Sequence, residues 1–219
     1  MHVVLTPKAL GDAAAYPPWC DLSWFQNCRH LTSSVEPHYH DLPEIYLWHE
    51  GKAEALIDDR PVPMRHGMLA YTAAGALHSY IPTTGIHSNT GITPRALPGC
   101  RPGHLHPKET GESPQPKAPS FCLTPEQNPF AAPLELPRHC FARHVACGRF
   151  AAGQAILAQR ATSWIGLLVR EGTINIRADS HVVEVPSDHL FLASPAVELK
   201  ATAVGGSEVA LAEGWPVAK

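Results

Sequence analysis

The sequence predicts an all-β protein whose antiparallel strands form a barrel or jelly roll. Three observations lead to this prediction. Short extended segments separated by turn signals recur along the 219-residue chain, as is typical of hairpin-rich β proteins. Residues 44–48 alternate along an extended chain, which places Glu44, Tyr46 and Trp48 on one face. The 22 prolines also disfavour helix interiors.

The strands are expected in two blocks with a turn-rich stretch between them. The first block comprises a strand-like run beginning at Leu22 and strands at 44–48, 53–57, 68–72 and 77–81, with a tight turn at 58–60. Pro, Gly, Ser, Thr and Asn dominate from about residue 82 to residue 136, as in a lid or a linker. The second block comprises strands at 155–159, 163–170, 173–177, 182–185, 190–193, 197–202 and 208–212.

Composition and charge exclude several classes of function. The net charge is −3 and the basic residues are scattered, so we expect no nucleic-acid partner. No window of 18 apolar residues and no secretory signal are found, so we expect no membrane partner and a cytoplasmic protein with reduced cysteines. A small molecule is the expected partner, and the sequence leaves homodimerisation open.

Four residues have the types and the spacing of a metal site. His38 and His40 are two residues apart, so on an extended chain their side chains point to the same face. Glu44 follows on the next extended segment, and His78 comes from a later strand. Three imidazoles and one carboxylate suit one divalent transition metal, namely Fe, Mn, Ni, Co or Zn. A polar cluster held by hydrogen bonds alone is the alternative.

The spacing of these residues resembles the two motifs of the cupin superfamily. His-x-His, three residues, Glu, six residues and Gly51 match the first motif without a gap. Gly67, Gly75 and His78 fit the second motif, whereas Ala73 and Pro82 replace its usual Pro and Asn. The resemblance covers about residues 30–82. It implies a double-stranded β-helix, or jelly roll, with His38, His40, Glu44 and His78 as metal ligands.

A weaker resemblance in the second block implies a bicupin. Counting back from Gly172 places Ile165 at the Glu position and Gln159 and Ala161 at the first two His positions, and Lys200 falls at the third. The implied domains are a metal-binding barrel at 1–88, a connecting segment or lid with shared strands at 89–140, and a degenerate barrel without metal ligands at 141–219. A single cupin with unrelated β-structure is the alternative.

The run Pro43–Tyr46 resembles two metal-dependent cupin classes, the cupin-type phosphoglucose isomerases and the lyases that cleave dimethylsulfoniopropionate. In the lyases, a Tyr two residues after the Glu is the base. The resemblance therefore implies catalytic roles for Tyr46 and Glu44, although a barrel-lining role for Tyr46 is equally open. Trp48, on the same face, is expected to form a wall of the substrate cavity.

A second His-x-His, at His104 and His106, lies in the turn-rich stretch. Its spacing to Glu109 differs from that of the first motif, and Pro and Gly crowd it, so a loop is favoured over a second ligand site. Such a loop could fold over the barrel mouth and contribute His106 or Lys108 to substrate binding.

The favoured function is that of a metal-dependent enzyme on a small oxygenated substrate, such as a sugar or a hydroxy acid. Metal-assisted proton transfer would make it an isomerase or a lyase. If the metal is Fe(II) and O₂ is a co-substrate, the same site predicts a dioxygenase. A non-catalytic cupin that senses a small ligand is the third hypothesis. No basic recognition segment follows residue 150, which disfavours a self-contained transcription factor.

Overall fold

The computed structural model describes residues 1–85, 87–96, 98–101, 104–111, 115–123 and 136–216, and these residues are nearly all in strands, turns and loops. The helical elements in this part of the chain are short: η1 (Pro7–Ala9), η2 (Ala13–Ala15) and α1 (Pro107–Thr110). The predicted all-β class is therefore confirmed. In the described ranges, no helix has the length and apolar character needed to span a membrane.

The chain forms two compact units. The first unit comprises residues 27–128, and the second comprises residues 1–26 and 129–219. Each unit contains a five-stranded and a four-stranded antiparallel sheet, an arrangement compatible with the predicted pair of barrels. The predicted division at residues 88 and 140 stays a prediction.

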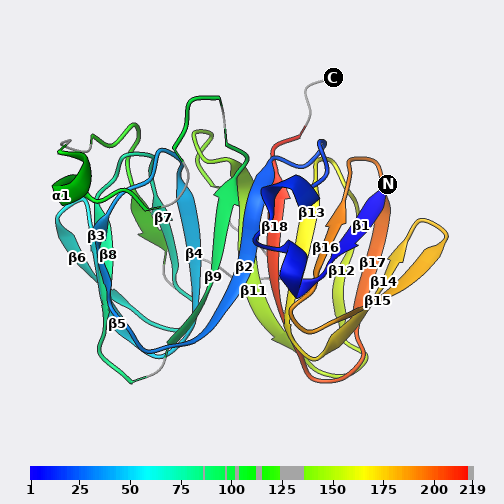
Figure 1. Ribbon diagram of the computed structural model, residues 1–219. Coiled ribbons are helices and arrows are strands. Elements are labelled where there is room, and N and C mark those ends of the chain that lie inside the picture. The colour runs from blue at the N-terminus through cyan, green and yellow to red at the C-terminus, as the bar shows by residue number, and fades with distance from the viewer. Residues whose placement is uncertain (86, 97, 102–103, 112–114, 124–135, 217–219) are drawn as a thin grey trace. The chain divides into compact units, whose positions relative to one another are not determined.

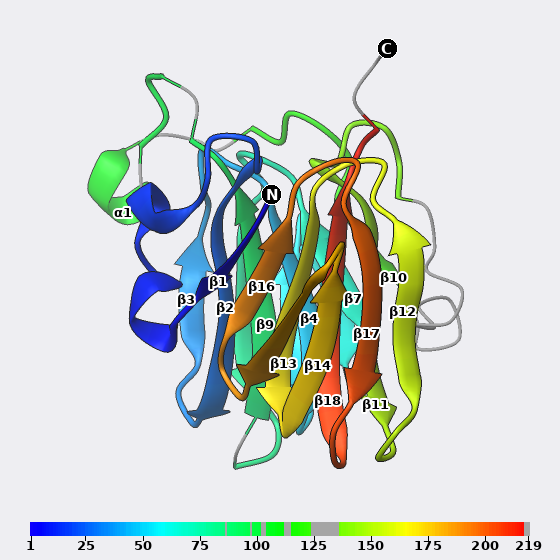
Figure 2. The ribbon, with the colours of Figure 1, turned by 90° about the vertical axis from the view of Figure 1, so that its right-hand side faces the viewer.

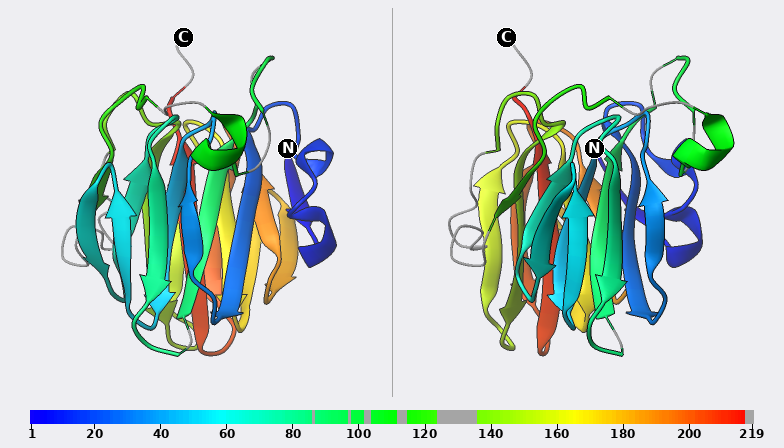
Figure 3. Two further views of the ribbon diagram at one scale, coloured as in Figure 1. Left: turned by 60° about the vertical axis from the view of Figure 1, so that its left-hand side comes forward. Right: turned by 90° about the vertical axis from the view of Figure 1, so that its left-hand side faces the viewer.

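The first unit contains the predicted metal ligands. Figure 1 labels most of its strands. Its five-stranded sheet has the order β10-β7-β4-β9-β2, with β10 (Phe121–Leu123), β7 (Leu69–Thr72), β4 (Glu44–Glu50), β9 (His87–Pro94) and β2 (Leu22–Leu31). Residues 22–26 at the start of β2 are grouped with the second unit. Its four-stranded sheet has the order β3-β8-β5-β6, with β3 (Val35–His38), β8 (His78–Pro82), β5 (Ala53–Ile57) and β6 (Arg60–Met64). Helix α1 lies at one end of these strands (Figure 3).

The second unit repeats this plan (Figure 2). Its five-stranded sheet has the order β1-β16-β13-β18-β11, with β1 (His2–Leu5), β16 (Leu190–Ala193), β13 (Ile165–Glu171), β18 (Ser207–Gly214) and β11 (Ala142–Phe150). Its four-stranded sheet has the order β12-β17-β14-β15, with β12 (Ala155–Arg160), β17 (Glu198–Ala203), β14 (Thr173–Ala178) and β15 (His181–Pro186).

The pairing of β4 with β7 in the first unit and that of β13 with β16 in the second unit agree residue by residue. Glu44 pairs with Thr72 in the first unit, and Ile165 pairs with Ala193 in the second, each position being 121 residues later. The same offset relates the bulge between Trp48 and Glu50 to the bulge between Val169 and Glu171. The weak repeat seen in the sequence is therefore a repeat of β-sheet register.

This register corrects one position of the predicted repeat. His38 pairs with His78, and Gln159 correspondingly pairs with Leu199, so Leu199 and not Lys200 stands at the third His position. The reason is the turn before the strand, where Ala196 adopts the positive φ of 72° that Gly75 adopts at 78°. Lys200, one residue on, points to the opposite face and is exposed.

Three of the four positions of the polar cluster are apolar in the second unit, and the fourth is the half-buried Gln159. Ala161, Ile165 and Leu199 are buried members of its hydrophobic core. Such side chains offer no atom that binds a metal ion.

Candidate metal centre

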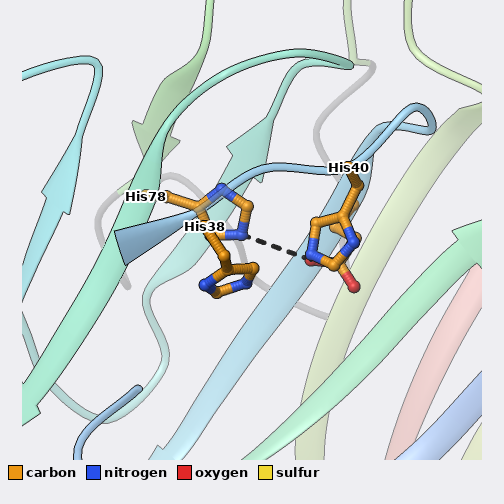
Figure 4. A group of neighbouring side chains, drawn as sticks. His38, His40 and His78 are labelled. Carbon is orange, nitrogen blue, oxygen red and sulfur yellow. Dashed lines mark ion pairs between the residues drawn. The ribbon is translucent and has the colours of Figure 1, made fainter. Parts of the chain in front are cut away.

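The four predicted ligands lie together inside the first unit. His38 ends β3 and faces His78 at the start of β8, and Glu44 begins β4. One donor atom from each of His38, His40, Glu44 and His78 lies within 4.8 Å of the others. All four residues are buried, and His40 is the most exposed at 8%. Figure 4 shows the three imidazoles turned toward one another.

Backbone carbonyls fix the tautomer of two of these histidines. Nδ1 of His38 lies 2.8 Å from the carbonyl oxygen of Glu36, and Nδ1 of His78 lies 2.9 Å from that of Ala76. Because a carbonyl only accepts hydrogen bonds, both Nδ1 atoms carry the proton. Each Nε2 then presents a lone pair, as in histidines that ligate metals.

Nε2 atoms of the cluster converge on a carboxylate. Nε2 of His40 and Nε2 of His78 lie 3.0 Å and 3.5 Å from Oε2 of Glu44. Nε2 of His38 is buried and has no hydrogen-bond partner among the described residues. Either a proton on Nε2 or a bound cation must separate each of these nitrogens from the carboxylate oxygen, and the donor set of three imidazoles and one carboxylate fits a divalent metal.

Burial and the charges within the cluster shift the pKa values of Glu44 and His38. Burial acts to raise the pKa of Glu44, but hydrogen bonds and charges from His40 and His78 outweigh it and hold the pKa well below its usual value. Burial lowers the pKa of His38 from 6.5 to about 3, and the charge of His78 adds to this effect. At neutral pH the site therefore offers an ionised carboxylate and a neutral His38, which are the forms that bind metals.

Comparison with solved structures identifies the architecture. The chain is similar to oxalate decarboxylase from Bacillus subtilis (14% identity over 97% of this chain and 72% of that chain, TM-score 0.65). It is also similar to quercetin 2,3-dioxygenase from Acinetobacter baumannii (13%, 98% and 80%, TM-score 0.60) and to a salicylate 1,2-dioxygenase variant from Pseudoaminobacter salicylatoxidans (13%, 87% and 68%, TM-score 0.51). The chain has the cupin fold. A scan against family models and a search of curated proteins found no match.

Tyr46 supports the carboxylate of Glu44, and Tyr80 packs against Tyr46. The hydroxyl of Tyr46 donates a hydrogen bond of 2.7 Å to Oε2 of Glu44, and its ring packs edge-on against Tyr80 at 5.5 Å. Burial raises the pKa of Tyr46 well above 10, and the charge of Glu44 adds to the rise. Tyr46 is thus a proton donor to a predicted ligand, and its role as a base stays a prediction. Sequence reasoning missed Tyr80, although its position two residues after His78 places it on the same strand face.

Trp48 lies deeper in the same interior. It is 1% exposed, its ring stacks on His87 at 5.0 Å, and its Nε1 donates to the carbonyl oxygen of Gly51. Tyr46, Trp48, His78 and Tyr80 line a cavity with a volume of about 10 Å³, which is room for about one water molecule. The role of Trp48 in binding substrate stays a prediction.

The second His-x-His also reaches the centre. The ring of His104 stacks on His38 at 4.1 Å and meets His40 edge-on at 5.0 Å. His106 lies farther away, at 6.0 Å from His38, and its Nδ1 donates to the carbonyl oxygen of Pro37 at 3.3 Å. Partial burial lowers the pKa of His104, and the charge of His40 adds to the effect. The sequence pointed to His106 or Lys108 from this loop, whereas His104 makes the closest ring contacts with the cluster.

Proposed function

We propose that this protein is a metal-dependent cupin enzyme that acts on a small oxygenated substrate. The observation that carries the proposal is the convergence of His38, His40, His78 and Glu44, which place one ligand atom each within 4.8 Å of one another. Two of the histidines are held in the metal-binding tautomer by backbone carbonyls. A cluster serving only to stabilise the fold would be expected to satisfy each buried nitrogen with a hydrogen bond.

The similar proteins support an oxygen-rich substrate. The interior beside Tyr46 and Trp48 has a cavity of only about 10 Å³, so a substrate would meet the cluster from outside this interior. The similar proteins named above act on oxalate, quercetin and salicylate, which are all oxygen-rich molecules able to chelate a metal. A sugar, a hydroxy acid or a related compound has the same capacity.

A bound divalent metal would polarise a substrate oxygen, and with iron it would also support oxygen-dependent chemistry. The chain's own residues hold the carboxylate and carry protons beside it. Glu44 receives a hydrogen bond from Tyr46, whose hydroxyl keeps its proton at neutral pH. This arrangement supports our first proposal of proton transfer in an isomerase or a lyase, with Tyr46 as the proton-bearing group.

A dioxygenase is the second candidate, because two of the three similar proteins are dioxygenases by name. The ligand set is common to both reactions, so the identity of the metal separates them.

Elemental analysis of protein purified without a His tag tests the proposal. The H38A/H40A variant should lose the metal, and H181A, which changes an exposed histidine of the second unit, should keep it. Stoichiometric iron with O₂ consumption would favour the dioxygenase, and Mn, Ni, Co or Zn would favour proton transfer. Wild type without metal, even after incubation with these ions, would contradict the enzyme and leave a small-ligand sensor as the better interpretation.

A further inference from the structure

The two His-x-His segments form one short antiparallel ribbon. Tyr39 and Leu105 exchange two backbone hydrogen bonds, from the Tyr39 amide to the Leu105 carbonyl at 3.0 Å and from the Leu105 amide to the Tyr39 carbonyl at 2.9 Å. Residues directly opposite in such a pair share a face, and their neighbours share the other face. The pairing therefore places His104 on the side of the ribbon where His38 and His40 lie.

Hydrogen bonds hold the ribbon in place on both sides of Leu105. Arg101 donates three hydrogen bonds to the carboxylate of Asp41, one from its backbone amide at 2.8 Å and two from its guanidinium at 3.0 Å. On the other side of Leu105, the hydroxyls of Tyr39 and Thr110 lie 3.2 Å apart. Because these contacts join segments about 60 residues apart, the position of His104 is set by several independent bonds.

His104 differs from the four buried residues in two ways. Its side chain is exposed to solvent, whereas the four are buried. It is also absent from the group whose donor atoms lie within 4.8 Å of one another. Its ring covers His38 and meets the edge of His40, the most exposed of the four, so it stands between the cluster and solvent.

We infer that His104 forms the outer wall of the substrate site and hydrogen-bonds a substrate oxygen that is not bound to the metal. The inference rests on the proposed function. The nearly filled interior leaves the exposed side, where His104 lies, as the side on which a substrate meets the cluster. A divalent ion beside the single carboxylate of Glu44 leaves an excess of positive charge, which favours an anion. The substrate class is thus a small carboxylate that carries a second oxygen.

Binding of a chelating anion to the cobalt-loaded protein tests this role without an assay of turnover. The visible spectrum of bound Co(II) reports the binding of oxalate, and acetohydroxamate serves as a second probe. H104A should bind oxalate about tenfold more weakly than wild type, since it loses one hydrogen bond to a charged group. H104Q should recover part of this loss. K52A, which removes an exposed side chain between β4 and β5 of the same unit, should bind as wild type does.

Metal content separates the outcomes. Equal oxalate affinity in wild type and H104A, with both fully loaded, overturns the role of His104 and leaves the metal site standing. Loss of cobalt from H104A also overturns it, because His104 would then be a ligand. Wild type that binds cobalt but neither probe overturns the substrate site, and wild type that binds no metal overturns the proposed function as well.

Discussion

The hydroxyl of Tyr46 lies 2.7 Å from Oε2 of Glu44, the same oxygen that His40 and His78 approach. One carboxylate oxygen thus accepts a hydrogen bond from a phenol and faces two imidazoles. All of these groups lie in the buried interior of the first unit. The phenol sets the orientation of the carboxylate, and this orientation directs Glu44 at the point where the three histidines converge.

Removal of this hydrogen bond should weaken metal binding. We expect Y46F to fold and to bind the metal about 10-fold to 100-fold more weakly, because partners that orient a ligand have effects of this size. Competition with a chelator measures the change. Y16F is the matched control, since the hydroxyl of Tyr16 donates to the carbonyl oxygen of Leu10 in the second unit. It should cost about 1 kcal/mol of stability and leave metal affinity unaltered.

Acid should destabilise the metal-free protein through His38. The pKa of His38 is 6.5 in the unfolded chain and about 3 in the folded protein, so the unfolded state binds more protons between these values. The free energy of unfolding therefore falls as the pH drops from about 6.5 toward 3. Across this pH range, the free energy of unfolding measured with urea should change less with pH in H38Q than in wild type. Identical slopes would mean that His38 is not held neutral by the fold.

Gly75 should not tolerate a side chain. Its φ is +78°, and an added Cβ would collide with the backbone carbonyl of Gln115. We expect G75A to lower the free energy of unfolding by more than about 1 kcal/mol, from backbone strain plus the collision. G85A is the control, because nothing lies within 4 Å of its Cβ position. Equal urea midpoints for the two variants would argue against the turn geometry.

The register of the second unit can be tested with two neighbouring substitutions. L199H buries an imidazole among apolar side chains and should cost about 2–4 kcal/mol, because Leu199 is 1% exposed in that core. K200H changes an exposed residue and should stay within about 0.5 kcal/mol of wild type. A larger loss of stability in K200H than in L199H would place Lys200 at the interior position that the sequence suggested.

The sequence by itself determined the fold class and the four residues of the cluster. Alternation along residues 44–48 fixes which side chains share a face, and the spacing of His38, His40 and Glu44 is a local property of extended chain. His78 could also be predicted, because the motif that contains it is separated from the first motif by hairpins of regular length. The meeting of His38 with His78 joins β3 and β8, which are not neighbours in the sequence, and only the spacing of the two motifs revealed it.

Only the tertiary structure decided the rest. His104 meets His38 through backbone bonds between Tyr39 and Leu105, a pairing that no local pattern encodes. Leu199 replaced Lys200 at the third position of the repeat because Ala196 takes a backbone conformation usually reserved for glycine. Both depend on how the chain closes over long distances. There the free energy of packing and of paired hydrogen bonds selects one register, and the residue types alone are compatible with several.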